Sequence, residues 1–173
     1  MPRKVATELD GRLMGNGNRS KWYSMNFNGA ILERGFWLYV WDIKGQGKRC
    51  LYVGRTGDSS SAHASSPFRR IGQHLDNRSN AKANAMHRRL LQAGFTPSRC
   101  SFQMIAIGPI FPEQTDYDRH KVYRDRISSL ESQLADHLRN RNFVVLGQHG
   151  KTRGRKEPAS EIIRIIDERI RAS

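Results

Sequence analysis

Residues 35–55 read GFWLYVWDIKGQGKRCLYVGR, and this stretch decides the fold. From Gly35 to Ile43, apolar and aromatic side chains occupy both alternating sets of positions, which predicts a strand covered on both faces. A glycine-containing turn at 44–49 separates this run from a second one at 50–53, which Gly54 ends. The two runs therefore predict an antiparallel hairpin.

The chain after the hairpin predicts helices and further strands. Ser66 is suited to cap a helix that begins at Pro67 and carries Phe68, Ile71 and Leu75 on one face. Gly108-Pro109 is expected to end a third strand, with a surface excursion over 108–120. Apolar periodicity predicts helices over 81–93, 124–139 and 160–172, the third strand over 101–107 and a short strand over 143–146.

The 173 residues contain no internal repeat, which indicates one α/β domain with a small three-stranded central sheet and flanking helices. Residues 1–20 show no sustained period and predict a loose basic arm, so the domain spans 21–173. Extra helices are expected in insertions at about 76–100 and 108–126 and at the C-terminus. The terminal helix carries Ile162, Ile166 and Ile170 on one stripe. We interpret this stripe as core packing, with the seam of a homodimer as the alternative.

The charge balance points to a polyanionic partner. Thirty Lys and Arg residues stand against 16 Asp and Glu residues, a formal charge of +14. Nucleic acid is the first expectation and an anionic membrane surface the second. No apolar run approaches the roughly 20 residues that span a bilayer, and no signal peptide is expected. Cys50 and Cys100 are too few for a disulfide framework, so a cytoplasmic protein in a reducing compartment is expected.

Two pairs of side chains are candidates for chemistry. Tyr39 and Tyr52 lie in adjacent strands and are expected to share a face of the sheet. Arg70 and His74 are four residues apart on one helix, so they stack on one side of it, and Arg78 is expected one turn further. An arginine fork suits a phosphate, and histidine can pass a proton near neutral pH. A solvated basic helix face is the alternative.

Glu131 is the third candidate, because it lies among Ile127, Leu130 and Leu134 in the apolar stripe of a helix. An unpaired carboxylate buried there would be costly. A divalent cation, Mg²⁺ or Mn²⁺, would compensate that charge and needs only one or two protein carboxylates. A structural partner such as an arginine is the alternative.

Other enzyme motifs are absent from the sequence. Residues 54–58, GRTGD, follow a strand but lack the spacing and the Gly-Lys-Ser/Thr ending of a phosphate-binding loop. No His-Glu-x-x-His motif occurs. Nucleotide hydrolysis is therefore not supported.

Taken in order, the candidate residues resemble the GIY-YIG nuclease family over about residues 35–142. Trp37-Leu38-Tyr39 stands at the first signature, and Tyr52-Val53-Gly54, followed by Arg55-Thr56, matches the second. Arg70 with His74 matches the helix signature. Glu131 matches the metal-binding glutamate, and Asn142 matches the family asparagine, with Asn140 as competitor.

One departure concerns the first signature, whose glycine is absent if Tyr39 is the catalytic tyrosine. If residues 35–37, Gly-Phe-Trp, are the signature instead, Trp37 replaces that tyrosine. We prefer Tyr39 because its distance along the chain to Tyr52 is closer to the family spacing.

The resemblance implies a metal-dependent endonuclease that cuts DNA, most simply double-stranded, and leaves a 5′-phosphate and a 3′-hydroxyl. It implies that Glu131 holds the metal and Arg70 neutralises charge on the phosphate. Tyr39 then orients or deprotonates the attacking water, Tyr52 positions the water or substrate, and His74 assists the proton transfer or binds phosphate.

A stand-alone chain of this kind is more similar to a sequence-specific restriction enzyme than to a repair or mobile-element nuclease. The rival interpretation is a non-catalytic nucleic-acid-binding protein on the same scaffold. The residues expected to contact the DNA backbone are Arg55, Arg78, Arg139, Lys151, Arg153, Arg155 and Lys156.

Overall fold

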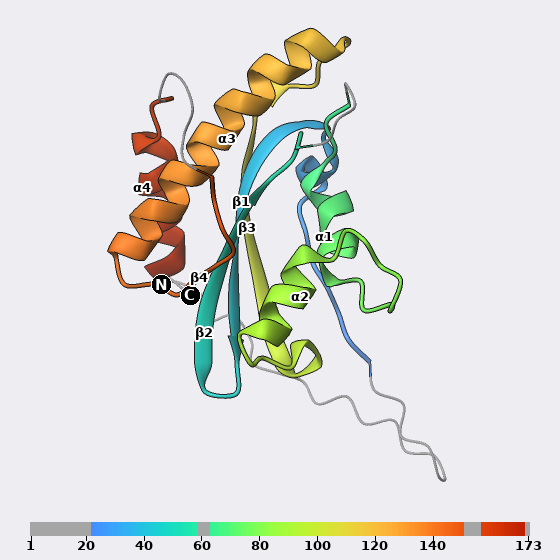
Figure 1. Ribbon diagram of the computed structural model, residues 1–173, viewed down its shortest axis with the longest axis vertical. Helices are drawn as coiled ribbons and strands as arrows, with labels where there is room; N and C mark the ends of the chain where they lie inside the picture. The colour runs from blue at the N-terminus through green and yellow to red at the C-terminus, as the bar shows by residue number, and fades with distance from the viewer. Residues whose placement is uncertain (1–21, 59–62, 151–156, 172–173) are drawn as a thin grey trace, which may run out of the picture.

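The computed structural model describes residues 22–58, 63–150 and 157–171 of the chain. It has an α/β architecture built on a mixed sheet (Figure 1). Over these residues the elements are η1 Gly29–Leu32, β1 Gly35–Gly45, β2 Lys48–Arg55, α1 Pro67–Leu75, α2 Ala85–Gln92, η2 Pro97–Arg99, β3 Cys100–Pro112, α3 Tyr117–Asn140, β4 Val145–Leu146 and α4 Ser160–Arg171.

The predicted hairpin is confirmed and forms the middle of the sheet. β1 and β2 pair antiparallel, and Trp41 stands opposite Tyr52. The strand order among the described residues is β3-β1-β2-β4, so the sheet has four strands where three were expected. The fourth strand, β4, lies within the short strand predicted over 143–146; it runs parallel to β2 and pairs with it only at Leu51 and Tyr52.

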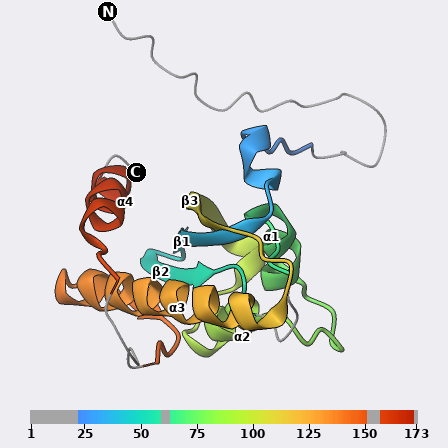
Figure 2. The same cartoon turned by 90° about the horizontal axis from the view of Figure 1, so that it is seen from above.

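Helices cover both faces of the sheet, which explains why β1 is buried from Gly35 to Ile43. On one face, Trp41 and Tyr52 pack with Met86 and Leu90 of α2, and α1 lies beside α2. On the other face, the side chains of β1 and β2 pack against α3 and α4. Figure 2 shows the sheet between these helices.

The terminal helix packs into the core. Ile166 and Ile170 of α4 are buried with Leu134 and Leu138 of α3. His137 Nε2 of α3 lies 3.1 Å from Asp167 Oδ1 of α4, so a polar contact joins the same two helices. Core packing of this helix is therefore confirmed, and a dimer seam through Ile166 and Ile170 is wrong.

The surface excursion predicted over 108–120 is wrong at both of its ends. β3 continues through Pro109 to Pro112, so residues 108–112 are strand rather than excursion. Proline is tolerated there because β3 lies at the edge of the sheet. Helix α3 begins at Tyr117 instead of 124, because the side chain of Asp116 caps it by accepting a hydrogen bond from Arg119 N.

The helix α1 follows its prediction closely. It begins at Pro67, and the hydroxyl of Ser66 accepts from Arg69 N as an N-cap. Arg78, however, lies beyond the end of α1 at Leu75, so it does not extend the row of Arg70 and His74. α2 covers only Ala85–Gln92 of the predicted 81–93.

No helix within the described parts of the chain is long and apolar enough to cross a membrane. The predicted arm at 1–20 lies outside the described residues, as do Lys151, Arg153, Arg155 and Lys156.

Candidate active site

The candidate site lies at the edge of β2, just past the point where β4 ends. β4 reaches only to the level of Tyr52, and the next carbonyl of β2, on Val53, accepts a hydrogen bond from His149 Nε2 at 3.2 Å. A pocket of about 370 Å³ opens here. Because the sheet stops at this edge, side chains from helices on its two faces can meet in one pocket.

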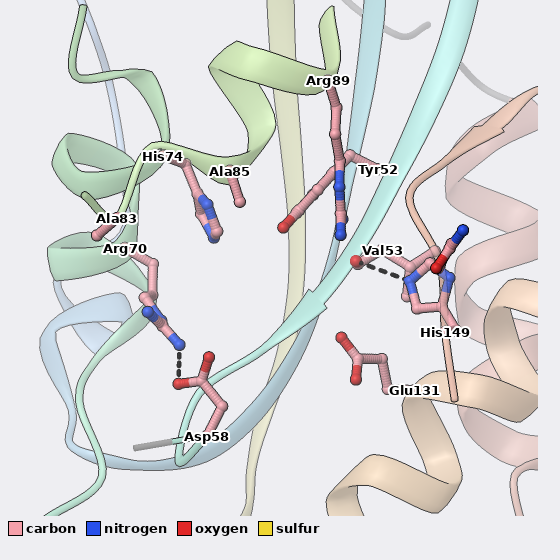
Figure 3. Close-up of a pocket in the computed structure, with 11 residues that line it drawn as sticks. Tyr52, Val53, Asp58, Arg70, His74, Ala83, Ala85, Arg89, Glu131 and His149 are labelled. Atoms are coloured by element: carbon pink, nitrogen blue, oxygen red, sulfur yellow. Dashed lines mark hydrogen bonds and ion pairs between the residues drawn. The ribbon is translucent and has the colours of Figure 1, made fainter. Parts of the chain in front are cut away.

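The pocket brings together residues that are far apart in the sequence. Arg70 and His74 enter from α1, Arg89 from α2 and Glu131 from α3, while Tyr52 lies on β2 (Figure 3). Four of these five residues were expected at the site. The walls therefore carry cations from one face of the sheet and a carboxylate from the other.

Tyr39 lies behind the pocket. It is 1% exposed, and its hydroxyl lies 2.7 Å from His74 Nε2 and 3.3 Å from the carbonyl of Arg55. Trp37, the alternative at this position, instead donates from Nε1 to the carbonyl of Glu33 at 3.1 Å. The geometry therefore favours Tyr39 over Trp37 as the aromatic residue of the first signature, because Tyr39 contacts a residue of the pocket and Trp37 does not.

Gly54 is required by the position of Tyr39. A Cβ at Gly54 would lie 2.5 to 2.7 Å from three atoms of the Tyr39 side chain, its hydroxyl oxygen included. The glycine of the Tyr52-Val53-Gly54 motif thus leaves room for the Tyr39 ring to reach His74.

Gly54→Ala is expected to push the Tyr39 ring away from His74. Overpacking of this kind costs about 1–3 kcal/mol of stability, and the variant should lose that amount in urea unfolding. Gly72→Ala is the control, because a Cβ at Gly72 in α1 has no atom within 4 Å. Removing a helical glycine there should leave stability equal or higher. Equal stability of Gly54→Ala and the natural protein would contradict this account of the motif.

His74 is neutral in the folded protein near pH 7. Burial, together with the charges of Arg70 and Arg89, lowers the pKa of His74 to about 4. The neutral ring carries one proton, and the Arg55 carbonyl can only accept. When the Tyr39 hydroxyl donates to that carbonyl, His74 Nε2–H donates to the Tyr39 oxygen and Nδ1 is a bare acceptor. Nδ1 is buried and has no hydrogen-bond partner among the described residues.

The low pKa of His74 predicts a loss of stability in acid. The unfolded state binds this proton with a pKa of about 6.5, above the folded value of about 4. The contribution of His74 to stability is therefore fully present above about pH 6.5 and is lost as the pH falls toward 4. Unfolding by urea at pH 7 and pH 4.5 should show a smaller acid loss for His74→Gln than for the natural protein. An equal loss in both would show that His74 is not the buried neutral group described here.

The two tyrosines are poor bases in this environment. Burial raises the pKa of Tyr39 and of Tyr52 above their usual range. The charges of Arg70 and Arg55 favour the Tyr39 phenolate, but the effect of desolvation on the pKa of Tyr39 is larger. Tyr52 faces the pocket, whereas Tyr39 contacts His74. This arrangement favours Tyr39 as a residue that positions His74 and disfavours direct deprotonation of water by Tyr39.

Arg70 is held at the pocket by two partners. Its Nη2 is bonded to the carboxylate of Asp58, and its Nη1 donates to Gln73 Oε1 at 3.1 Å. Its Nε is buried without a hydrogen-bond partner among the described residues. The guanidinium is thus oriented with its Nε–H still unsatisfied, which suits an incoming acceptor.

Glu131 is not the unpaired carboxylate that the apolar stripe suggested. Its side chain is 18% exposed, and its Oε2 accepts from Arg55 Nε at 2.8 Å. The arginine partner, the alternative interpretation, is therefore present. Arg55 consequently supports Glu131, and its guanidinium also donates to the Arg124 carbonyl at 3.4 Å.

Glu131 is a carboxylate at the pocket that could bind a divalent cation. Within the described residues, no group of three or more His, Cys, Asp or Glu side chains could hold a metal ion. Mg²⁺ is commonly bound through one or two carboxylates, with water and substrate phosphate as the other ligands. Glu131 faces the pocket and fits an open site of this kind (Figure 3).

Four other predicted residues do not line the pocket. Asn142 is exposed and adopts φ 65°, the left-handed conformation with which asparagine often follows a helix end. Its competitor Asn140 is the exposed last residue of α3. Arg78 pairs with Asp76, and Arg139 donates to the Gly147 carbonyl and to His149.

Asp58, Arg89 and His149 also line the pocket, and none of them was predicted from the sequence. Arg89 had a detectable signal, because it lies three residues after Met86 and beside Leu90, at the margin of the buried stripe of α2. Asp58 and His149 lie in loops, where periodicity gives no orientation.

No family model, curated protein or solved structure matches the chain. The function therefore has to be inferred from the site itself.

Proposed function

We propose that this protein is a metal-dependent endonuclease of the GIY-YIG type that hydrolyses phosphodiester bonds in DNA. One observation carries the proposal: Tyr52, Arg70, His74 and Glu131, from three separate elements, line one pocket. Tyr39 contacts His74 directly behind it. The net charge of +14 supports a polyanionic substrate.

In this proposal Arg70 binds the scissile phosphate. The guanidinium is preorganised by Asp58 and Gln73, so it does not need to reorganise when charge develops on the phosphate oxygens. Asp58 also holds Arg70 in place before substrate arrives. The phosphate then shares the guanidinium with that carboxylate or displaces it.

His74 takes the proton of the attacking water, and Tyr39 positions the ring. A negatively charged phosphate beside Arg70 counters one of the two cations that lower the pKa of His74. Substrate binding therefore makes His74 a stronger base at the moment it is needed. Tyr52, whose hydroxyl faces the same pocket, orients the water or the substrate.

Glu131 would hold a single Mg²⁺ or Mn²⁺ in this proposal. When bound, that ion supplies Lewis-acid stabilisation of charge on the phosphate and on the leaving 3′ oxygen. Arg55 holds the carboxylate at the pocket by donating from its Nε to Glu131 Oε2 at 2.8 Å. The expected products carry a 5′-phosphate and a 3′-hydroxyl.

Incubation of supercoiled plasmid with the protein tests the proposal. Nicked and linear DNA should form with Mg²⁺ or Mn²⁺ and not with EDTA, and DNA ligase should reseal the ends. Discrete fragments would support a restriction-type enzyme, whereas a smear would support a nuclease of low specificity. Absence of cutting with any divalent cation would refute the proposed endonuclease activity.

The second candidate is a nucleic-acid-binding protein without catalysis. The Arg55–Glu131 ion pair favours it, because it gives the carboxylate a structural partner. This candidate predicts DNA binding that is unchanged by EDTA, with no cleavage under any condition.

A further inference from the structure

Arg89 of α2 enters the pocket from a different helix than Arg70. Its guanidinium carbon lies 5.5 Å from the centre of the Tyr52 ring. Figure 3 shows Arg70 and Arg89 extending from separate elements into the same pocket, with Glu131 across from them. The stacking contact on Tyr52 restricts the guanidinium without using its N–H donors.

Gly147 leaves room for this guanidinium because it has no side chain. Gly147 has φ +94°, and a Cβ at this position would collide with the guanidinium of Arg89. The Gly147 carbonyl in turn accepts from Arg139 Nη2 at 2.9 Å, which fixes the loop after β4. Arg89 is therefore packed between the Tyr52 ring and a glycine whose loop is fixed by Arg139. Its guanidinium is preorganised, as expected of a residue that binds a ligand.

The charges in the pocket distinguish Arg89 from its neighbours. Arg70 is paired with Asp58, and Arg55 is paired with Glu131. For Arg89, no carboxylate within the described ranges forms an ion pair with the guanidinium. A part-buried, oriented guanidinium without an acid partner is suited to an anion from outside the protein.

We propose that Arg89, seated on Tyr52 and Gly147, binds a second backbone phosphate of the nucleic acid, next to the phosphate held by Arg70. This inference rests on the proposed function, since it assumes that the pocket receives a polynucleotide. Two phosphate-binding residues on separate helices fix the direction of the strand as well as its position.

Charge removal at Arg89 is compared with the same change at Arg88, its exposed neighbour on α2. Binding of a duplex oligonucleotide is measured by fluorescence anisotropy in EDTA, where no cleavage occurs, over a series of salt concentrations. Arg89→Gln should weaken binding about tenfold or more, as expected for a lost charge-assisted hydrogen bond. The slope of log affinity against log salt should fall by about 0.9. Arg88→Gln should change neither quantity.

Arg89→Lys separates the charge from the packing on Tyr52. It keeps a cation beside the ring, so it should restore the salt slope while affinity stays below that of the natural protein, since the fork is lost. Equal binding and equal salt slopes for Arg89→Gln and Arg88→Gln would overturn the inference, as would a lysine variant that fails to restore the slope.

The plasmid assay separates this inference from the proposed function. If the natural protein never cuts but Arg89→Gln loses binding, the enzyme is refuted and the phosphate site stands. If the natural protein cuts and Arg89→Gln cuts as fast as Arg88→Gln, the enzyme stands and the phosphate site is refuted.

Discussion

Glu131→Gln is expected to reduce metal-dependent cleavage to background, while DNA affinity stays near normal or becomes tighter. The amide oxygen can still accept from Arg55, so the fold around the ion pair is retained. The change removes the anionic ligand and also removes a negative charge that repels the substrate. Initial rates of plasmid cleavage, anisotropy with duplex DNA and Mn²⁺ binding followed by electron paramagnetic resonance measure the three effects.

Glu161→Gln is the control for this variant, because it makes the same charge change on the exposed surface of α4, where Glu161 pairs with Arg164. Exposed pairs of this kind contribute little, so cleavage should remain at the natural rate. Retained Mg²⁺-dependent cutting by Glu131→Gln would refute the proposed role of Glu131 as the metal ligand, on which the proposed function depends.

Arg70→Ala should lower the cleavage rate about a hundredfold to a thousandfold, the range seen when one preorganised donor to a developing charge is removed. Arg70 lies in the pocket and is oriented by Asp58 and Gln73, whereas Arg69 is exposed on α1. Arg69→Ala should therefore cause only a modest loss of affinity. Single-turnover kinetics at saturating protein separate the chemical step from binding. The reverse order of the two variants would show that the wrong side of α1 faces the substrate.

Local sequence patterns were sufficient for the elements that bring most of the site together. The Ser66-Pro67 start and the apolar period of α1 predicted a helix that presents Arg70 and His74 on one side. The alternation in β1 and β2 placed Tyr39 and Tyr52 on a common face. These are short-range effects, in which spacing along the chain sets direction in space.

Long-range pairing is what the sequence could not reveal. Glu131 was interpreted as unpaired because its partner, Arg55, lies 76 residues away. The contact between Tyr39 and His74 could not be predicted for a similar reason, since only the packed structure shows that His74 lies in front of Tyr39. Asn142 was assigned by its distance from Glu131, yet the turn that ends α3 directs it to solvent.

The two-residue strand β4 has a consequence for how the site depends on the rest of the molecule. Because β4 is so short, α1 and α3 reach the same pocket from opposite faces of the sheet. The sheet thus acts as a spacer whose thickness, with the packing of each helix on it, sets the gap between Arg70 and Glu131. Leu134 and Leu138 are buried between α3 and the strands. They therefore help to set the distance between Arg70 and Glu131, although neither leucine lines the pocket.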